Sequence, residues 1–250
     1  MRFVSRSVLA WTAEEKAVIG SAWNELAPTL DHLQLPLPKT IYFVKTTGEE
    51  EGEQEYTRGT AIILPQSAVD KTKTSSLKGT IAHELFHVLS RNAPELRGKL
   101  YETIGFLPCE EISFPPALAD RKLTDPDAPK NDHYIRLRLA GKAVLAVPIL
   151  YSKAAHYDTS KGGPFFQYVE FRFLLVNKER SSPSVVVYNK LSPALVTPDQ
   201  VSDFYEQVGR NTNYIVHPEE ILADNFKFLL MGTSNLPSPA VLQRLSSVLK

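Results

Sequence analysis

The chain has 250 residues, of which 43% are hydrophobic, and its 28 basic and 28 acidic side chains leave no net charge. This length and apolar content allow a large core in one domain, or in one domain with an elaborated insert. The balanced charge and the lack of a basic stripe argue against nucleic acid or an anionic membrane as a partner.

At the N-terminus, the apolar run within residues 1–10 is too short for a signal peptide, and no later stretch is long enough to span a bilayer. We therefore expect a soluble, cytoplasmic protein. Thr12 and Glu15 form a capping-box pattern that predicts a helix running toward Pro28, with Trp11 before it as a hydrophobic staple. Residues 39–45 and 60–65 are apolar and β-branched and predict two strands.

The segment His83-Glu84-Leu85-Phe86-His87 follows these strands and matches the zinc-hydrolase signature His-Glu-x-x-His. On a helix, the spacing of four residues places His83 and His87 on one face, where both imidazoles can bind one Zn²⁺. Glu84 lies beside them and can act as a general base toward a water that the metal activates. The motif therefore predicts a catalytic zinc site.

The residues around this motif predict a helix over 76–91, with a start signal at Ser75 and a stop at Pro94. One face of this helix is apolar and would pack on a core, whereas the other face carries His83 and His87. A surface helix with an ordinary solvated polar face would show the same pattern, so the rest of the chain has to decide between the two interpretations.

Downstream, residues 94–104 predict a short helix and residues 112–129 a loop. Cys109 is the only cysteine, which excludes an internal disulfide; it is read as a small buried residue, with capping of the zinc as the alternative. A β-rich insert over about 130–190 follows. Its predicted strands cover 135–139, 143–151, 165–176 and 185–188.

The C-terminal part is predicted to be helical over 197–208, 218–231 and 239–249. Catalytic zinc normally has three protein ligands, so a third ligand is expected downstream, and a glutamate on the second of these helices is the remaining option. A metzincin continuation is excluded by Ser90 and Ala93, and the segment after Gly232 lacks the aspartate of a Gly-Thr-x-x-Asp motif.

Glu220 and Asp224 remain as the best ligand and its supporting acceptor, since residues four apart share a helix face. Glu102, Glu110 and Glu111 lie nearer to the first motif and stay open as rival ligands, although none has an aspartate four residues later.

In these two motifs the chain resembles the glutamate-zincin metallopeptidases, whose second motif is Glu-x-x-x-Asp. The run Glu220, Ala223, Asp224 and Asn225 is similar to that of the neprilysin-like branch. The gap of 133 residues between His87 and Glu220 is much longer than in thermolysin-like members. The resemblance therefore covers two short motifs and leaves the rest of the chain without a counterpart.

The resemblance implies an α+β, zincin-like, two-lobed fold with a mixed sheet and the active-site helix in an upper lobe (about 1–110). A helical lower lobe (about 197–250) follows the insert within a single metallopeptidase domain. It also implies Zn²⁺ held by His83, His87 and Glu220, Asp224 as partner of a ligating histidine, and the strand at 60–64 as the sheet edge that pairs with substrate.

By the same resemblance, the expected reaction is hydrolysis of a peptide or protein substrate, with Glu84 as the base and Tyr214 or His217 as oxyanion donor. His156 and Tyr157, on a loop at 152–164, are further candidates. Two other interpretations stay open: a degenerate or structural zinc-binding interaction module without turnover, and a hydrolase of a different bond. Substrate identity and oligomeric state have no signature in the sequence.

Overall fold

The computed structural model describes residues 2–69, 74–156, 158–163, 165–178, 185–187 and 194–250. The chain is α+β and divides into two compact units, one formed by Met1–Leu100 with Leu222–Lys250 and the other by Tyr101–Ile221. The single-domain boundaries expected from the sequence remain a prediction. Among the described residues, no helix is long and apolar enough to cross a membrane.

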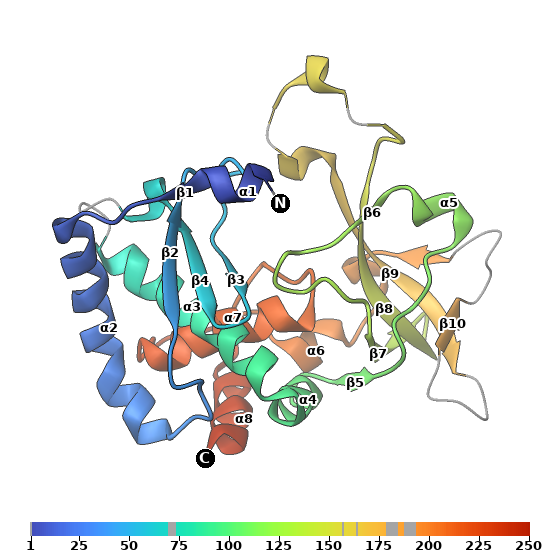
Figure 1. Cartoon of the computed structure of the whole chain (residues 1–250). Coiled ribbons are helices and arrows are strands. Elements are labelled where there is room, and N and C mark those ends of the chain that lie inside the picture. The colour runs from blue at the N-terminus through green and yellow to red at the C-terminus, as the bar shows by residue number, and fades with distance from the viewer. Residues whose placement is uncertain (1, 70–73, 157, 164, 179–184, 188–193) are drawn as a thin grey trace. The chain divides into compact units, whose positions relative to one another are not determined.

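The first unit contains, within its described residues, a four-stranded sheet in the order β1-β2-β4-β3. Strands β2 and β4 are parallel, and β3 pairs antiparallel with β4. The helices and strands of this unit, drawn mainly in blue, teal and red in Figure 1, are α1 (Arg2–Ser7), β1 (Val8–Leu9), α2 (Ala13–Leu33), β2 (Tyr42–Thr46), β3 (Tyr56–Arg58), β4 (Ala61–Pro65), α3 (Thr74–Asn92) and α8 (Pro239–Leu249). Two helices, α4 (Pro94–Glu102) and α7 (Pro218–Leu230), continue across the division between the units.

The strands predicted at 39–45 and 60–65 are confirmed as β2 and β4, but the expectation that 60–64 forms the sheet edge is wrong. Among the described residues β4 lies between β2 and β3, and the edge strands are β1 and β3; β3 pairs with β4 in the register Tyr56 to Ile63 and Arg58 to Ala61. Residues 56–58 follow an acidic turn, and three residues are too few to show the alternating pattern of a strand. Their strand conformation depends on pairing with β4.

Helix α2 begins as predicted, because Thr12 and Glu15 form the complete capping box. It does not stop at Pro28, however, and ends at Leu33 with Gln34 in the left-handed conformation. Proline removes one backbone hydrogen bond from a helix interior. The buried side chains of Leu26 and Leu30, on either side of it, stabilise the helix enough to continue.

Helix α3 is confirmed at the predicted place, and the apolar face expected for it is fully buried. Its polar residues are buried only in part: Glu84 is 3% exposed and His87 is 1% exposed, whereas His83 is partly exposed and Ser76 is exposed. A fully solvated polar face is therefore not what the structure shows at the motif, although Ser76 in the first turn of the helix stays exposed. Burial of such groups costs free energy unless they are bonded, so the partners of Glu84 matter for the stability of this helix.

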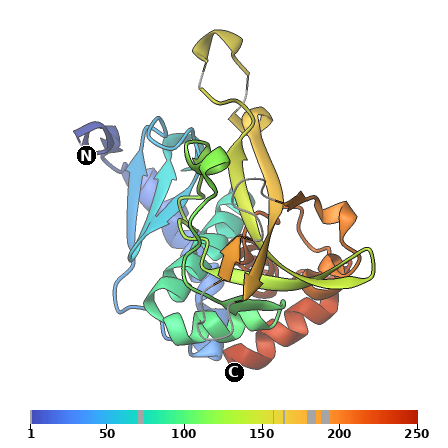
Figure 2. The same ribbon diagram turned by 90° about the vertical axis from the view of Figure 1, so that its right-hand side faces the viewer.

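The second unit is built on an antiparallel sheet that holds seven strands among the described residues, with the path β10-β9-β8-β7-β5 and with β11 and β6 joined to β9 and β8. Figure 2 shows the long yellow-green hairpin of this sheet. The elements are β5 (Phe106–Pro108), α5 (Pro116–Ala119), β6 (Lys122–Leu123), β7 (His133–Leu139), β8 (Lys142–Ser152), β9 (Val169–Lys178), β10 (Val185–Val187), β11 (Leu195–Val196) and α6 (Phe204–Val208). The strands predicted within 130–190 are found as β7, β8, β9 and β10, except that Phe165–Tyr168 forms a 3-10 turn before β9; the status of this segment as an insert stays a prediction.

The helix predicted over 197–208 is interrupted. Pro198–Gln200 forms one 3-10 turn and α6 starts only at Phe204, because Val201 adopts an extended conformation and bridges Leu139 of β7. The side chain of Asp203 accepts a hydrogen bond from the backbone of Arg138 at 2.7 Å. Contacts with the sheet therefore override the local helix signal.

Candidate metal centre

His83, Glu84 and His87 form a compact group on α3, with one potential ligand atom of each within 4.8 Å of the others. The two imidazole rings lie 4.9 Å apart, edge to face. The sequence prediction that both histidines share one helix face is therefore confirmed. Imidazole nitrogens are common zinc ligands, so this donor set fits Zn²⁺.

His83 is oriented by a residue from the second sequence motif. Its Nδ1 lies 3.1 Å from Oδ1 of Asp224 on α7, and the same oxygen accepts a hydrogen bond from Lys227 at 2.6 Å. A carboxylate paired with an ammonium group accepts hydrogen bonds, so Nδ1 of His83 carries the proton. In the neutral ring the lone pair is then on Nε2, which is the tautomer that a metal ligand requires.

Glu84 is held by the edge strand β3. The hydroxyl of Thr57 donates to Oε2 of Glu84 at 2.8 Å, and the backbone carbonyl of Thr57 accepts a hydrogen bond from Arg91 on α3. Thr57 is itself completely buried. This residue was missed in the sequence, where nothing in the short segment between the acidic turn and Gly59 indicates a partner for the motif.

Glu220 is buried at 2% exposure on α7, one helical turn before Asp224. It is not among the three residues of the compact group, and its role as a ligand stays a prediction. The rival ligands Glu102, Glu110 and Glu111 are all exposed at the surface. A metal ligand is held in a fixed orientation by its surroundings, which favours the buried Glu220 over all three.

The carboxylate next to Glu220 has a separate partner. Glu219 is equally buried and accepts a hydrogen bond from the hydroxyl of Tyr101. The ring of Tyr101 lies edge to face on His133, with centroids 4.6 Å apart, and also contacts His217. This buried polar cluster was not predicted, because its members are scattered over more than 110 positions of the chain.

His217 has both ring nitrogens engaged in the second unit. Nδ1 accepts the backbone N–H of Glu219 at 3.1 Å, so the proton is on Nε2, which donates to the carbonyl of Lys130 at 3.2 Å. Burial lowers the pKa of His217 to about 4, so the ring is neutral at pH 7. These contacts give His217 a structural role, because they link it to the backbone of Lys130 and Glu219. Its role as oxyanion donor remains a prediction.

Tyr214 donates its hydroxyl to Oδ2 of Asp125 at 2.5 Å, and burial, together with the charge of Asp125, raises its pKa above the ordinary value for tyrosine. The phenol thus stays protonated and keeps a proton to donate. Of the other candidates, His156 is exposed and Tyr157 lies outside the described residues. The structure tests none of these three as an oxyanion donor.

Cys109 behaves as a partly buried thiol. Burial, reinforced by the charge of Asp132, raises its pKa to about 12. It belongs to the second unit and is not part of the group on α3.

No protein-family model, curated protein sequence or solved structure matches this chain. The case for a function therefore depends on the residues and geometry described above.

Proposed function

We propose that the protein is a zinc-dependent peptidase in which His83, His87 and Glu220 hold the ion and Glu84 is the general base. The observation that carries this proposal is the hydrogen bond between His83 and Asp224, which joins the two sequence motifs across 141 positions. An accidental His-Glu-x-x-His helix has no reason to meet the aspartate of a distant Glu-x-x-x-Asp segment. A metal-ligating histidine needs such an acceptor.

Bound zinc would polarise the scissile carbonyl and make water more acidic at neutral pH. Glu84 takes a proton from the attacking water as its oxygen adds to the carbonyl carbon. The C–N bond then breaks, and the same carboxyl group passes the proton to the leaving amine. Thr57 keeps the carboxylate in one orientation through both transfers, and Asp224 keeps His83 in its ligating tautomer.

A buried carboxylate at position 84 distinguishes this proposal from a purely structural zinc site. Structural sites are commonly closed by four protein ligands and have no need of a base. The expected partner is a peptide or protein, and the proposal includes neither nucleic acid nor membrane. Turnover of a peptide is what separates it from a zinc-binding interaction module.

The test combines zinc content with cleavage of a peptide library. Glu84→Gln should retain stoichiometric zinc and lose about 10²- to 10⁴-fold in cleavage rate, because it removes the base and keeps the ligands. His87→Ala should lose both zinc and cleavage. His32→Ala changes an exposed histidine of α2 and serves as the matched control, with both properties unchanged.

Three results would overturn the proposal. Full zinc in both His83→Ala and His87→Ala would show that the metal binds elsewhere. Unchanged cleavage in Glu84→Gln would remove the general base. A zinc-loaded wild type that cleaves no member of the library would favour the interaction module.

A further inference from the structure

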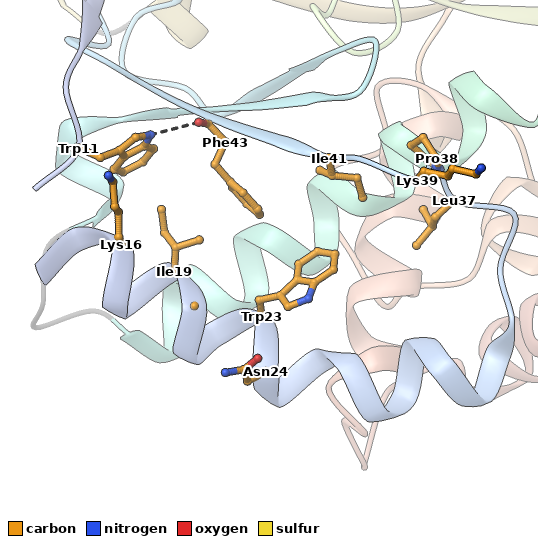
Figure 3. Close-up of a pocket in the computed structure, with 11 residues that line it drawn as sticks. Trp11, Lys16, Ile19, Trp23, Asn24, Leu37, Pro38, Lys39, Ile41 and Phe43 are labelled. Atoms are coloured by element: carbon orange, nitrogen blue, oxygen red, sulfur yellow. Dashed lines mark hydrogen bonds between the residues drawn. The ribbon is translucent and has the colours of Figure 1, made fainter. Parts of the chain in front are cut away.

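A pocket of about 480 Å³ lies within the first unit, between α2 and the segment that leads into β2 (Figure 3). Small-molecule sites usually enclose about 300–1,000 Å³ and combine an apolar lining with a few polar groups. None of the lining residues belongs to the group on α3. They are Trp11, Lys16, Ile19, Gly20, Trp23, Asn24, Leu37, Pro38, Lys39, Ile41 and Phe43.

The pocket is aromatic, and it contains both tryptophans of the chain. Trp23 and Phe43 meet edge to face at 6.2 Å, and Nε1 of Trp11 donates to the carbonyl of Phe43 at 3.1 Å. All three side chains remain partly exposed. These contacts hold flat apolar surfaces in place beside solvent, so the pocket is already formed before a ligand arrives.

Gly20 leaves room in the wall of the pocket that α2 provides. A Cβ atom built there would meet no atom within 4 Å. Glycine inside a helix is unfavourable relative to alanine, and its backbone conformation here needs no glycine. Because Gly20 lines the pocket, a large side chain at this position can occupy part of its volume.

The charge of the lining is one-sided. It includes two lysines and no acidic residue, in a chain whose basic and acidic side chains are equal in number. Glu15 precedes Lys16 in the sequence, but its carboxylate forms an ion pair with Lys45 at 2.8 Å. Over the part of the chain that the structure describes, neither Lys16 nor Lys39 has an ion-pair partner. Figure 3 places Lys16 next to Trp11 and Lys39 at the opposite end, with its ammonium group turned outward.

We propose that this pocket binds a small amphipathic monocarboxylate of the fatty-acid class. The carboxylate meets Lys16, and the apolar body extends past Phe43 and Trp23 toward Ile41. Aromatic faces provide the apolar contact, and the unpaired ammonium provides the charge that selects an anion over a neutral or cationic ligand of the same shape. This binding activity is separate from the proposed hydrolysis and needs no metal.

Because both tryptophans line the pocket, intrinsic fluorescence of the full-length protein reports its occupancy directly. The probe is decanoate, titrated at pH 7 below its micelle concentration, with decanol and decylamine as matched ligands of the same chain length. The expected result is a saturable spectral change with decanoate. Decanol should bind at least several-fold more weakly, and decylamine more weakly still.

Three variants locate the site. Gly20→Leu should weaken decanoate binding at least tenfold by filling the pocket. Lys16→Glu should weaken it by about fivefold or more, in the range expected for losing and reversing one exposed charge contact. Lys39→Glu carries the same charge change but points away, so its effect should be clearly smaller. Lys99→Glu, at an exposed position on α4, should have no effect.

The absence of a saturable change with decanoate, or equal affinity for decanoate and decylamine, would overturn the proposal. Equal losses in Lys16→Glu and Lys39→Glu would overturn the placement of the carboxylate. Wild-type affinity in a folded Gly20→Leu protein would show that decanoate binds elsewhere. If circular dichroism shows that Gly20→Leu is unfolded, the comparison of Lys16→Glu with Lys39→Glu decides.

Discussion

The hydroxyl of Thr57 donates a 2.8 Å hydrogen bond to Oε2 of Glu84, and this bond connects the edge strand β3 to the helix that carries the candidate metal group. Both residues are buried, so the bond is shielded from water. A hydrogen bond to a charged group in such a place contributes about 1.5–3 kcal/mol. Thr57 is therefore expected to position the base rather than to touch substrate.

Thr57→Val should lower kcat about 10- to 100-fold, because valine has the same shape but cannot donate to the carboxylate. Zinc content and KM should stay close to wild type, since neither histidine is changed. Thr57→Ser keeps the hydroxyl and should retain most of the activity. Steady-state kinetics on one cleaved peptide measures the three proteins, and equal kcat for the valine and serine variants would contradict the positioning role.

Asp224→Ala should weaken zinc affinity about 10- to 100-fold, the usual effect of losing the acceptor that orients a ligating histidine. Asp224→Asn should lose less, because its amide oxygen still accepts the proton of His83. Lys227→Met is the control, since it removes the other partner of Asp224 and leaves the contact with His83. Competition with a chelating dye gives the affinities. Tight binding in Asp224→Ala together with loss in Lys227→Met would refute this assignment.

Glu220→Ala should abolish tight zinc binding and cleavage, since it leaves only two histidine ligands. Glu219→Gln should bind zinc normally but lose about 1–3 kcal/mol of unfolding free energy, because the hydroxyl of Tyr101 loses a charged acceptor. Glu111→Ala changes an exposed rival and should behave as wild type. Zinc titration and urea unfolding separate these effects. Normal zinc in Glu220→Ala with loss in Glu219→Gln, Glu102→Ala or Glu111→Ala would reassign the third ligand.

The stability of the metal-free protein should fall as the pH is lowered from about 6.5 to about 4, in part through His217. Burial lowers the folded-state pKa of this residue to about 4 from 6.5, so over this interval the unfolded chain binds a proton that the folded chain does not. The expected loss from this group is about 3 kcal/mol, or about 1.4 kcal/mol per pH unit.

Urea unfolding at several pH values, compared between wild type and His217→Gln, isolates this contribution. The variant lacks the titrating ring, so its stability should change less over the same interval. Parallel pH dependences in the two proteins would show that His217 is not buried in the neutral form.

The sequence alone predicted the elements that have a strong local signal. Helix α3 was predicted because its apolar residues recur with the helical period, and α2 because Thr12 and Glu15 form a capping box. Strands β2 and β4 followed from their β-branched content. The spacing of His83 and His87 also determined their common face, since four residues make about one helical turn.

Only the tertiary structure decided the features that depend on partners distant in sequence. Pairing with β4 makes a strand of residues 56–58, and contact with β7 interrupts the helix expected after Thr197. The bonds from Thr57 to Glu84 and from His83 to Asp224 span 27 and 141 positions. Local patterns reflect the conformational preference of a few neighbouring residues. The free energy of such distant contacts exists only once the chain has folded and brought them together.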